Sequence, residues 1–127
     1  IFHPAKTGVF LALKRSPDSF TRPNDWDLPG GNVLFGELHG DSLKKEIHEE
    51  TSLDVEFVKP IHVVTNFEKG RYFLFIGFWG KALDKNVKIS DEHSEYKWVT
   101  KNEFVDLKPA QYLVDSVTKT IIKDNCY

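Results

Sequence analysis

Cysteine is almost absent from this chain. The only cysteine among the 127 residues is Cys126, the second residue from the C-terminal end. A single cysteine excludes an intramolecular disulfide framework and any zinc site built from several thiolates. Proteins without disulfides are typical of reducing compartments, so the cytoplasm is the expected location.

Long apolar runs and an excess of basic residues are also missing. No run approaches the roughly 20 apolar residues that span a bilayer, and no segment resembles a signal peptide, so a membrane partner is not expected. The formal net charge is -2 and the isoelectric point is near 6.2. A broad nucleic-acid-binding surface would need clustered positive charge. Small phosphorylated molecules are therefore better candidate substrates than DNA or RNA.

The composition that is present describes one folded domain. Hydrophobic residues make up 40% of the chain and aromatic residues 13%, which argues against disorder at a length suited to a single core. No linker, repeat or low-complexity segment divides residues 1–127. Residues 1–4 read as the tail of a strand, so we expect a single domain that lacks the start of its first strand.

Hydrophobic patterning predicts an alternation of strands and helices. Residues 9–13 form a short apolar run that predicts a buried strand paired with residues 1–2. Residues 53–57 and 61–64 predict two further strands separated by Pro60. The dense apolar run 72–79 predicts a central strand covered on both faces and ended by Gly80.

The C-terminal third predicts one strand and two helices. Residues 95–99 form the strand, and the following Thr100 and Glu103 match a capping box at the start of a short helix. Leu113, Val117 and Ile121 recur every fourth residue, which predicts an amphipathic helix.

Glutamates concentrate between residues 31 and 53. If Asp41 or Ser42 caps a helix, Glu46, Glu49 and Glu50 fall at positions i, i+3 and i+4 and share one side of it. Like charges at this spacing destabilise a helix by about 0.2 to 0.5 kcal/mol per pair, which a bound divalent cation would offset. The spacing therefore indicates a metal site.

The same stretch resembles the Nudix box. Gly31, Glu37, Glu46, Glu49 and Glu50 match its pattern, a coincidence expected about once in ten thousand chains of this length at average residue usage. The preceding residues 26–31, WDLPGG, resemble the lead-in of that family. The resemblance implies an α/β fold in which a mixed β-sheet is sandwiched between α-helices (α/β/α).

Two positions depart from the box. Lys45 stands where the family has arginine, and a lysine ammonium braces a neighbouring carboxylate less rigidly than a planar guanidinium. Ser52 stands where the family has glycine, which typically adopts a left-handed conformation at the end of the helix. We expect the chain to turn differently at residue 52.

The resemblance implies Mg²⁺-dependent or Mn²⁺-dependent hydrolysis of a nucleoside diphosphate linked to another group. The leading candidate is a MutT-like reaction that converts a nucleoside triphosphate to a monophosphate and pyrophosphate. Hydrolysis of ADP-ribose, another nucleotide sugar or an RNA 5′ end is one alternative. A non-catalytic nucleotide-binding module is another, although such modules typically lose the box acids that this chain retains.

Carried onto this sequence, the resemblance implies a set of site residues. The metal ligands are the Gly30 carbonyl, Glu46, Glu49 and Glu50. Glu46 is also the expected general base, with Glu95 as a competing catalytic base that is slightly favoured over Glu92. Three further residues are expected to contact the substrate or support the cluster: Arg15, Glu37 and Lys45.

Base recognition and assembly stay open at this level. Strand alternation places Tyr72, Leu74 and Ile76 on one face of their strand and Phe73 and Phe75 on the other, but it does not tell which face meets the cleft. His93 is a weaker candidate for substrate contact. Dimers are common in the family, so a homodimer is one expectation for the assembly.

Overall fold

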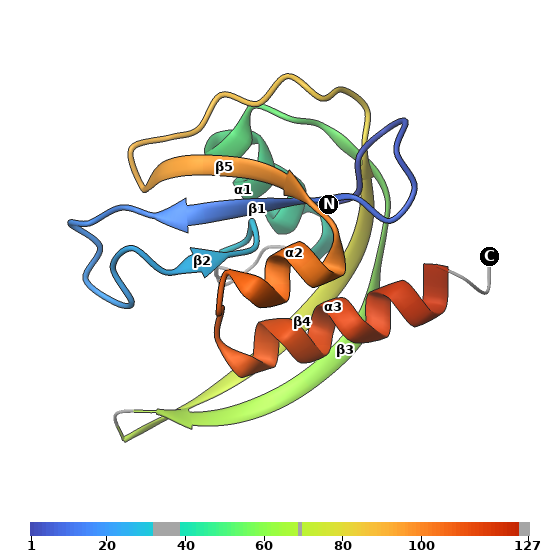
Figure 1. The fold of residues 1–127 in the computed structure, drawn as a ribbon. Helices are drawn as coiled ribbons and strands as arrows, with labels where there is room; N and C mark the ends of the chain where they lie inside the picture. Colours follow the sequence, from blue (N-terminus) through green and yellow to red (C-terminus); the bar gives the residue numbers. More distant parts are fainter. Residues whose placement is uncertain (32–38, 69, 125–127) are drawn as a thin grey trace.

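The computed structural model describes residues 1–31, 39–68 and 70–124 (Figure 1). The elements, in chain order, are β1 (Phe10–Arg15), β2 (Trp26–Asp27), α1 (His39–Thr51), β3 (Val55–Glu68), β4 (Arg71–Ala82), β5 (His93–Val99), α2 (Lys101–Asp106) and α3 (Gln111–Asp124).

The strands form two antiparallel groups that the N-terminal residues join. One group has the order β2-β1-β5, and the other is the β3-β4 hairpin. Phe2 forms an antiparallel bridge to Phe10 of β1 and a parallel bridge to Lys81 of β4. The expected pairing of residues 1–2 with the first long strand is therefore confirmed, and the combined arrangement is mixed.

Helices cover both faces of this arrangement, as expected for an α/β/α sandwich. On one face Ile47 of α1 packs with Leu11 and Leu13 of β1. On the opposite face Phe104 of α2 and Leu113 of α3 pack in a second cluster that contains Phe10, Ala12, Trp26 and Val99. Figure 1 shows α1 behind the strands and α2 and α3 in front of them. Strand alternation directs successive β1 side chains to these two clusters.

The prediction that Pro60 separates two strands was wrong. β3 runs without interruption through Pro60, and its pairing with β4 shifts register between Glu56 and Lys59 and between Pro60 and His62. Proline lacks the N–H that a sheet ladder needs, and strands accommodate it at bulges. The irregular register on both sides keeps Pro60 inside a single long strand.

The prediction for residues 72–79 was also partly wrong. The strand begins at Arg71 and continues through Gly80 to Ala82. It is not covered on both faces, because Tyr72 is 79% exposed and Leu74 is 64% exposed. On the other face Phe73 is 45% exposed, whereas Phe75 packs against Tyr112 of α3 at a ring distance of 4.8 Å.

The helix boundaries follow the sequence signals with one difference. Thr100 and Glu103 form the expected capping box at the start of α2, and α3 spans the predicted amphipathic segment. α1 begins at His39, so Asp41 lies in its first turn and does not precede it. The cap of α1 falls next to residues 32–38, outside the described residues.

Ser52 keeps the left-handed turn that the sequence analysis expected it to avoid. Its φ is +62°, and its N–H donates to the His48 carbonyl at 2.9 Å. The buried Thr51 hydroxyl beside it donates to the Ile47 carbonyl at 2.6 Å and accepts from the Leu53 N–H at 3.2 Å. These bonds fix the exit of α1, and the serine accepts the steric cost of the turn.

Ser52→Gly should stabilise the protein. Glycine removes the steric strain of the left-handed conformation but loses more backbone entropy on folding than serine does. The net result should be a rise of about 0.5 to 1 kcal/mol in the free energy of unfolding. Urea unfolding measures this change. Ser94→Gly, in the exposed part of β5 where φ is not positive, is the control and should be destabilising. A loss of stability in Ser52→Gly would contradict this account of the turn.

Candidate active site

A cavity of about 490 Å³ opens where β1 and β2 end near the C-terminal part of α1. Three segments supply most of its walls: the loop after β1, the Asp27 to Gly30 segment, and the residues that lead into β5. The lining residues are Arg15, Ser16, Asp18, Ser19, Phe20, Thr21, Asp27, Leu28, Gly30, Glu50, Asp91, Glu92 and His93.

Glu50 is the buried carboxyl group of this cavity. It lies in the last turn of α1, is only 6% exposed, and accepts a hydrogen bond from the Gly30 N–H at 2.9 Å. Burial raises the pKa of Glu50 to about 8, and the nearby carboxylates of Glu92, Glu46 and Asp27 act in the same direction, against the effect of the Gly30 N–H. A buried carboxyl surrounded by other acids is a site that a cation would stabilise in its ionised form.

Glu92 and His93 complete a cluster with Glu50. One ligand atom from each of the three residues lies within 4.8 Å of the others. The His93 Nδ1 is buried and has no hydrogen-bond partner, and burial lowers the pKa of His93, which favours a neutral ring with a free lone pair. An unpaired buried nitrogen beside two carboxylates fits a divalent cation, which would satisfy all three groups.

Backbone hydrogen bonds hold the loop that carries Glu92 against α1 and β1. The Lys88 N–H donates to the Thr51 carbonyl at 2.9 Å, the Ser90 N–H donates to the Glu50 carbonyl at 3.1 Å, and the Ser16 N–H donates to the Glu92 carbonyl at 3.0 Å. Sequence spacing does not reveal this contact, because the loop lies some forty residues after the glutamates of α1. The cluster is thus assembled by the tertiary fold.

Glu46 lies against the paired glycines. A Cβ atom added to Gly31 would meet the Cδ of Glu46 at 2.7 Å and its Oε2 at 2.8 Å. Glycine at residue 31 therefore lets the backbone approach a box glutamate closely. The end of the WDLPGG lead-in therefore lies next to a glutamate of α1.

Gly31→Ala should reduce turnover without unfolding the protein. The added methyl group pushes on the flexible end of Glu46, so the stability cost should be small, whereas a displacement of about 1 Å at a reacting group can cost 100-fold in rate. We expect kcat to fall by about 10-fold to 100-fold, measured by steady-state kinetics beside thermal unfolding.

Gly30→Ala is the matched comparison, since its added Cβ meets nothing within 4 Å. Its loss of kcat should be several-fold smaller than that of Gly31→Ala. Equal losses in the two variants would contradict a specific role for the contact between Gly31 and Glu46.

The remaining predicted residues lie in different environments. Glu49 is exposed on α1, and Lys45 is also exposed there. Glu95 is exposed on β5 opposite Lys14 and is not among the residues that line the cavity, whereas Glu92 is. Glu37 falls outside the described residues.

Arg15 is held by the protein itself. Its guanidinium donates to the Thr21 carbonyl, the Ser19 and Thr21 hydroxyls and the Asp27 carboxylate, at 2.8 to 3.0 Å. Four of its five N–H donors are thereby in use. The substrate role predicted for Arg15 stays a prediction, and its contacts in the structure shape the loop that follows β1.

Asp27 is the site residue that sequence reasoning missed. Its carboxylate accepts from Arg15 and from Arg22, each at 3.0 Å, and from the Leu28 N–H at 2.8 Å. Asp27 occupies the variable position of the WDLPGG lead-in, so the family pattern does not mark it as a site residue. Asp27 therefore links β2 to the end of β1 and to Arg22 in the loop that follows β1.

Comparison with known proteins agrees with this arrangement. The NUDIX domain family model matches residues 1–119. The chain is a NUDIX family member. It is 29% identical over 110 residues to the nucleoside triphosphatase NudI of Escherichia coli O139:H28, with 77% of each chain covered. The NUDIX relationship makes it a pyrophosphohydrolase that acts on nucleotides.

Solved structures show the same fold. The MutT protein of Methanosarcina mazei Go1 superposes with a TM-score of 0.82 at 27% identity, covering 97% of this chain and 88% of that one. A C. elegans Ap4A hydrolase superposes with a TM-score of 0.78 at 20% identity, covering 94% and 88%. In this NUDIX domain no helix of the described ranges is long and apolar enough to cross a membrane.

Proposed function

We propose that this NUDIX protein hydrolyses a nucleoside triphosphate to a nucleoside monophosphate and pyrophosphate with Mg²⁺, or with Mn²⁺ in its place. The observation that carries the proposal is the cluster of Glu50, Glu92 and His93 in a cavity walled by Gly30. Phosphates need a cation and closely approaching backbone, and this cavity offers side chains that could hold the cation and the backbone of Gly30. The name of the NudI relative supports a triphosphate as the substrate.

The protein would hold the cation with carboxylates on one side of the cavity. We propose Glu46, Glu49, Glu50 and the Gly30 carbonyl as ligands, with Glu92 and His93 closing the cluster. A divalent cation supplies charge neutralisation for the pyrophosphate and acidifies bound water. His93 adds a nitrogen donor that suits Mn²⁺ better than Mg²⁺.

Glu46 is the proposed general base. Its carboxylate would accept a proton from the attacking water while the water oxygen bonds to phosphorus and the bond from phosphorus to the bridging oxygen breaks. The pyrophosphate then leaves with the electron pair of that bond. The absence of a side chain at Gly31 leaves the space that the Glu46 carboxylate occupies, and a general base must be within reach of the proton that it accepts.

Product analysis tests the proposed reaction. Nucleoside triphosphates, oxidised nucleotides, nucleotide sugars and dinucleoside polyphosphates would be incubated with the protein and Mg²⁺, and the products separated by ion exchange. Monophosphate and pyrophosphate from a triphosphate are the expected products. Release of orthophosphate from triphosphates, or turnover only of nucleotide sugars or dinucleoside polyphosphates, would overturn the proposal.

Of the two loop acids that the sequence left open, we propose Glu92 as the functional one. It lies within 4.8 Å of Glu50 and His93 and lines the cavity, whereas Glu95 lies on β5 and is not among the lining residues. Glu92→Gln should lower kcat/KM by about 10-fold to 100-fold and raise the Mn²⁺ concentration needed for half-maximal rate. Glu95→Gln is the matched control, with less than a twofold change expected. A larger loss in Glu95→Gln would reverse the assignment.

We also propose that two copies pair through the exposed face of the β3-β4 hairpin. Cross-strand pairs bring apolar side chains together on this face, in the order Val63 with Ile76, Thr65 with Leu74, and Phe67 with Tyr72. The five apolar members are all at least 38% exposed. At the usual area of such side chains they expose about 500 Å² per copy, which doubled in a two-fold dimer reaches the roughly 1,000 Å² that is the minimum for a biological interface.

Sedimentation analysis tests the dimer. The wild-type protein should sediment as a dimer at tens of micromolar, and Leu74→Glu combined with Ile76→Glu should sediment as a monomer. Val105→Glu, at an exposed apolar position on α2, is the control and should stay dimeric. A wild-type monomer at that concentration would overturn the proposal.

A further inference from the structure

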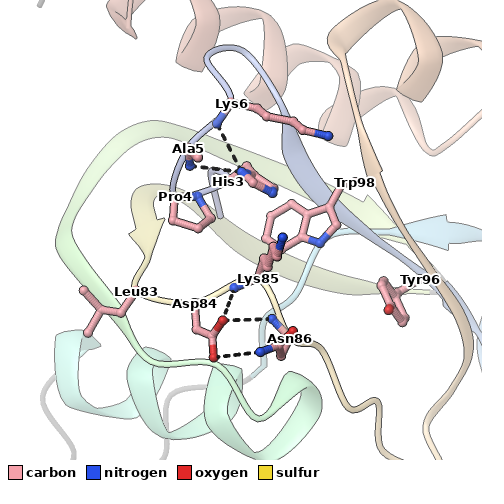
Figure 2. Close-up of a pocket in the computed structure, with 10 residues that line it drawn as sticks. All are labelled: His3, Pro4, Ala5, Lys6, Leu83, Asp84, Lys85, Asn86, Tyr96 and Trp98. Carbon is pink, nitrogen blue, oxygen red and sulfur yellow. Dashed lines mark hydrogen bonds between the residues drawn. The ribbon is translucent and has the colours of Figure 1, made fainter.

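A second cavity of about 630 Å³ lies away from the candidate active site (Figure 2). The N-terminal turn, the loop after β4, and two residues of β5 form its walls. The lining residues are His3, Pro4, Ala5, Lys6, Leu83, Asp84, Lys85, Asn86, Tyr96 and Trp98. β5 reaches both cavities. His93 lines the candidate active site and Trp98 lines the second cavity. The two residues are about 17 Å apart along the strand.

Backbone bonds hold the walls of this second cavity in place. The Phe2 N–H donates to the Gly80 carbonyl at 2.8 Å, and the Ala82 N–H donates to the Phe2 carbonyl at 2.9 Å. The His3 N–H donates to the Val9 carbonyl at 2.8 Å, and the Leu83 N–H donates to the Asp54 carbonyl at 2.9 Å. The N-terminal turn and the loop after β4 are thus fixed to the same sheet, and the cavity is preformed.

His3 offers a hydrogen-bond donor to this cavity. Its Nδ1 accepts from the N–H groups of Ala5 and Lys6, at 3.0 and 3.1 Å. A ring nitrogen that accepts two hydrogen bonds carries no proton, so the neutral ring holds its proton on Nε2. His3 is 8% exposed, and its ring meets the Trp98 ring edge to face at 4.8 Å. The donor is therefore fixed in orientation.

Positive charge gathers beside this donor. Burial lowers the pKa of His3, and the ammonium groups of Lys6 and Lys85, which line the same cavity, act in the same direction. Figure 2 shows the Lys6 side chain above the His3 ring and the Lys85 side chain beside the Trp98 ring, each from a different segment. The Asp84 carboxylate does not oppose them fully, because it accepts from the Lys85 and Asn86 N–H groups and from the Asn86 side-chain amide.

The same cavity has an aromatic wall. Tyr96 and Trp98 are two residues apart on β5. Their side chains therefore project from the same face of the strand. Tyr96 is 41% exposed and leaves a ring surface on which a planar group can stack. Two ammonium groups, an N–H donor and an aromatic surface form a set that is complementary to a phosphate carried on a planar ring.

We infer that this second cavity is a binding site for a nucleoside monophosphate, separate from the active site, in which Lys6, Lys85 and His3 hold the phosphate and Tyr96 stacks on the base. The inference does not depend on the reaction proposed above, because it rests on residues of the other cavity.

Nuclear magnetic resonance titration of the ¹⁵N-labelled protein tests the site. Adenosine monophosphate, inorganic phosphate and adenosine would be added separately, without metal and with chelator, so that nothing turns over. Adenosine monophosphate should shift the Trp98 indole N–H signal and the Lys6 and Lys85 backbone signals in a saturable way, with an affinity at least tenfold higher than either fragment. Signals of Gly30 and His93 report any binding at the active site independently.

Substitutions of lysine by alanine complete the test. Lys6→Ala combined with Lys85→Ala should weaken binding of adenosine monophosphate at least tenfold, while Lys88→Ala, at an exposed position in the same loop, should leave it unchanged. Shifts confined to the active site, affinity unaltered by the double substitution, or equal affinities for inorganic phosphate and adenosine monophosphate would each overturn the inference.

Discussion

Glu50→Gln should lower kcat/KM for the Mg²⁺-dependent reaction by at least about 100-fold, since loss of one charged ligand typically removes several kcal/mol of transition-state stabilisation. Glu50 is the buried acid of the Glu50, Glu92 and His93 cluster. The substitution keeps the size of the side chain and an oxygen that can accept from the Gly30 N–H. It removes only the charge that the cation needs, and initial rates over a range of Mg²⁺ concentrations measure the loss.

Stability separates this effect from misfolding. Because burial raises the pKa of Glu50 to about 8, the group is largely neutral at pH 7 without metal, and glutamine mimics that neutral form. The unfolding midpoint of metal-free Glu50→Gln at pH 7 should therefore equal or exceed that of the wild type. Full Mg²⁺-dependent turnover in a folded Glu50→Gln protein would refute the role of Glu50 as a ligand.

The second large effect is a loss of stability of the metal-free protein as pH rises. The folded-state pKa of Glu50 is raised from 4.5 to about 8, so folding binds a proton in this range and the stability from this group falls between about pH 4.5 and 8. The full shift corresponds to about 5 kcal/mol, which solvent access and relaxation reduce to about 2 or 3 kcal/mol. For a domain of this size we expect a fall of about 10 °C in the unfolding midpoint.

Comparison with Glu50→Gln isolates this group. The pKa of His93 and of His3 is lowered by burial, so these residues favour the folded state above pH 6.5 and act with the opposite sign. The difference between the wild type and Glu50→Gln cancels them. Mg²⁺ at pH 8 should restore the wild-type midpoint and leave that of Glu50→Gln unchanged. A difference that does not vary with pH would contradict the buried environment of Glu50.

Local signals predicted most of the fold. The capping box of Thr100 and Glu103 and the four-residue spacing of Leu113 and Val117 depend only on neighbouring residues, and the structure contains both helices. Residues whose environment depends on distant parts of the chain were harder to predict. Pro60 lies within one strand because the pairing of β3 with β4 shifts register on both sides of it. The residues around Pro60 do not predict this pairing, because it depends on a second strand.

The exposed face of β4 shows the same limit. Tyr72 and Leu74 are as apolar as the side chains that alternate with them, so sequence patterning predicts burial on both faces. In the structure Tyr112 of α3 covers Phe75 on one face of β4. The face that carries Tyr72 and Leu74 is exposed. The position of a covering helix is a property of the whole fold, and the residues of β4 alone do not contain it.

The candidate site divides in the same way. Glu46 and Glu50 share one helix, so their spacing revealed them together. Glu92 and His93 reach Glu50 only through a loop fixed to the end of α1, and Asp27 joins through two arginines. No sequence interval relates these residues to the glutamates of the box.

Direct observation of the cation tests the central claim, which is that Glu50 and its neighbours bind a divalent metal ion. Electron paramagnetic resonance measures free Mn²⁺ during titration into the metal-free protein at pH 8. The wild-type protein should remove Mn²⁺ from solution in a saturable way, and Mg²⁺ should compete for the site. Glu50→Gln should weaken that binding at least tenfold, while Glu95→Gln should not change it. Equal Mn²⁺ binding by the wild type and Glu50→Gln would contradict the account.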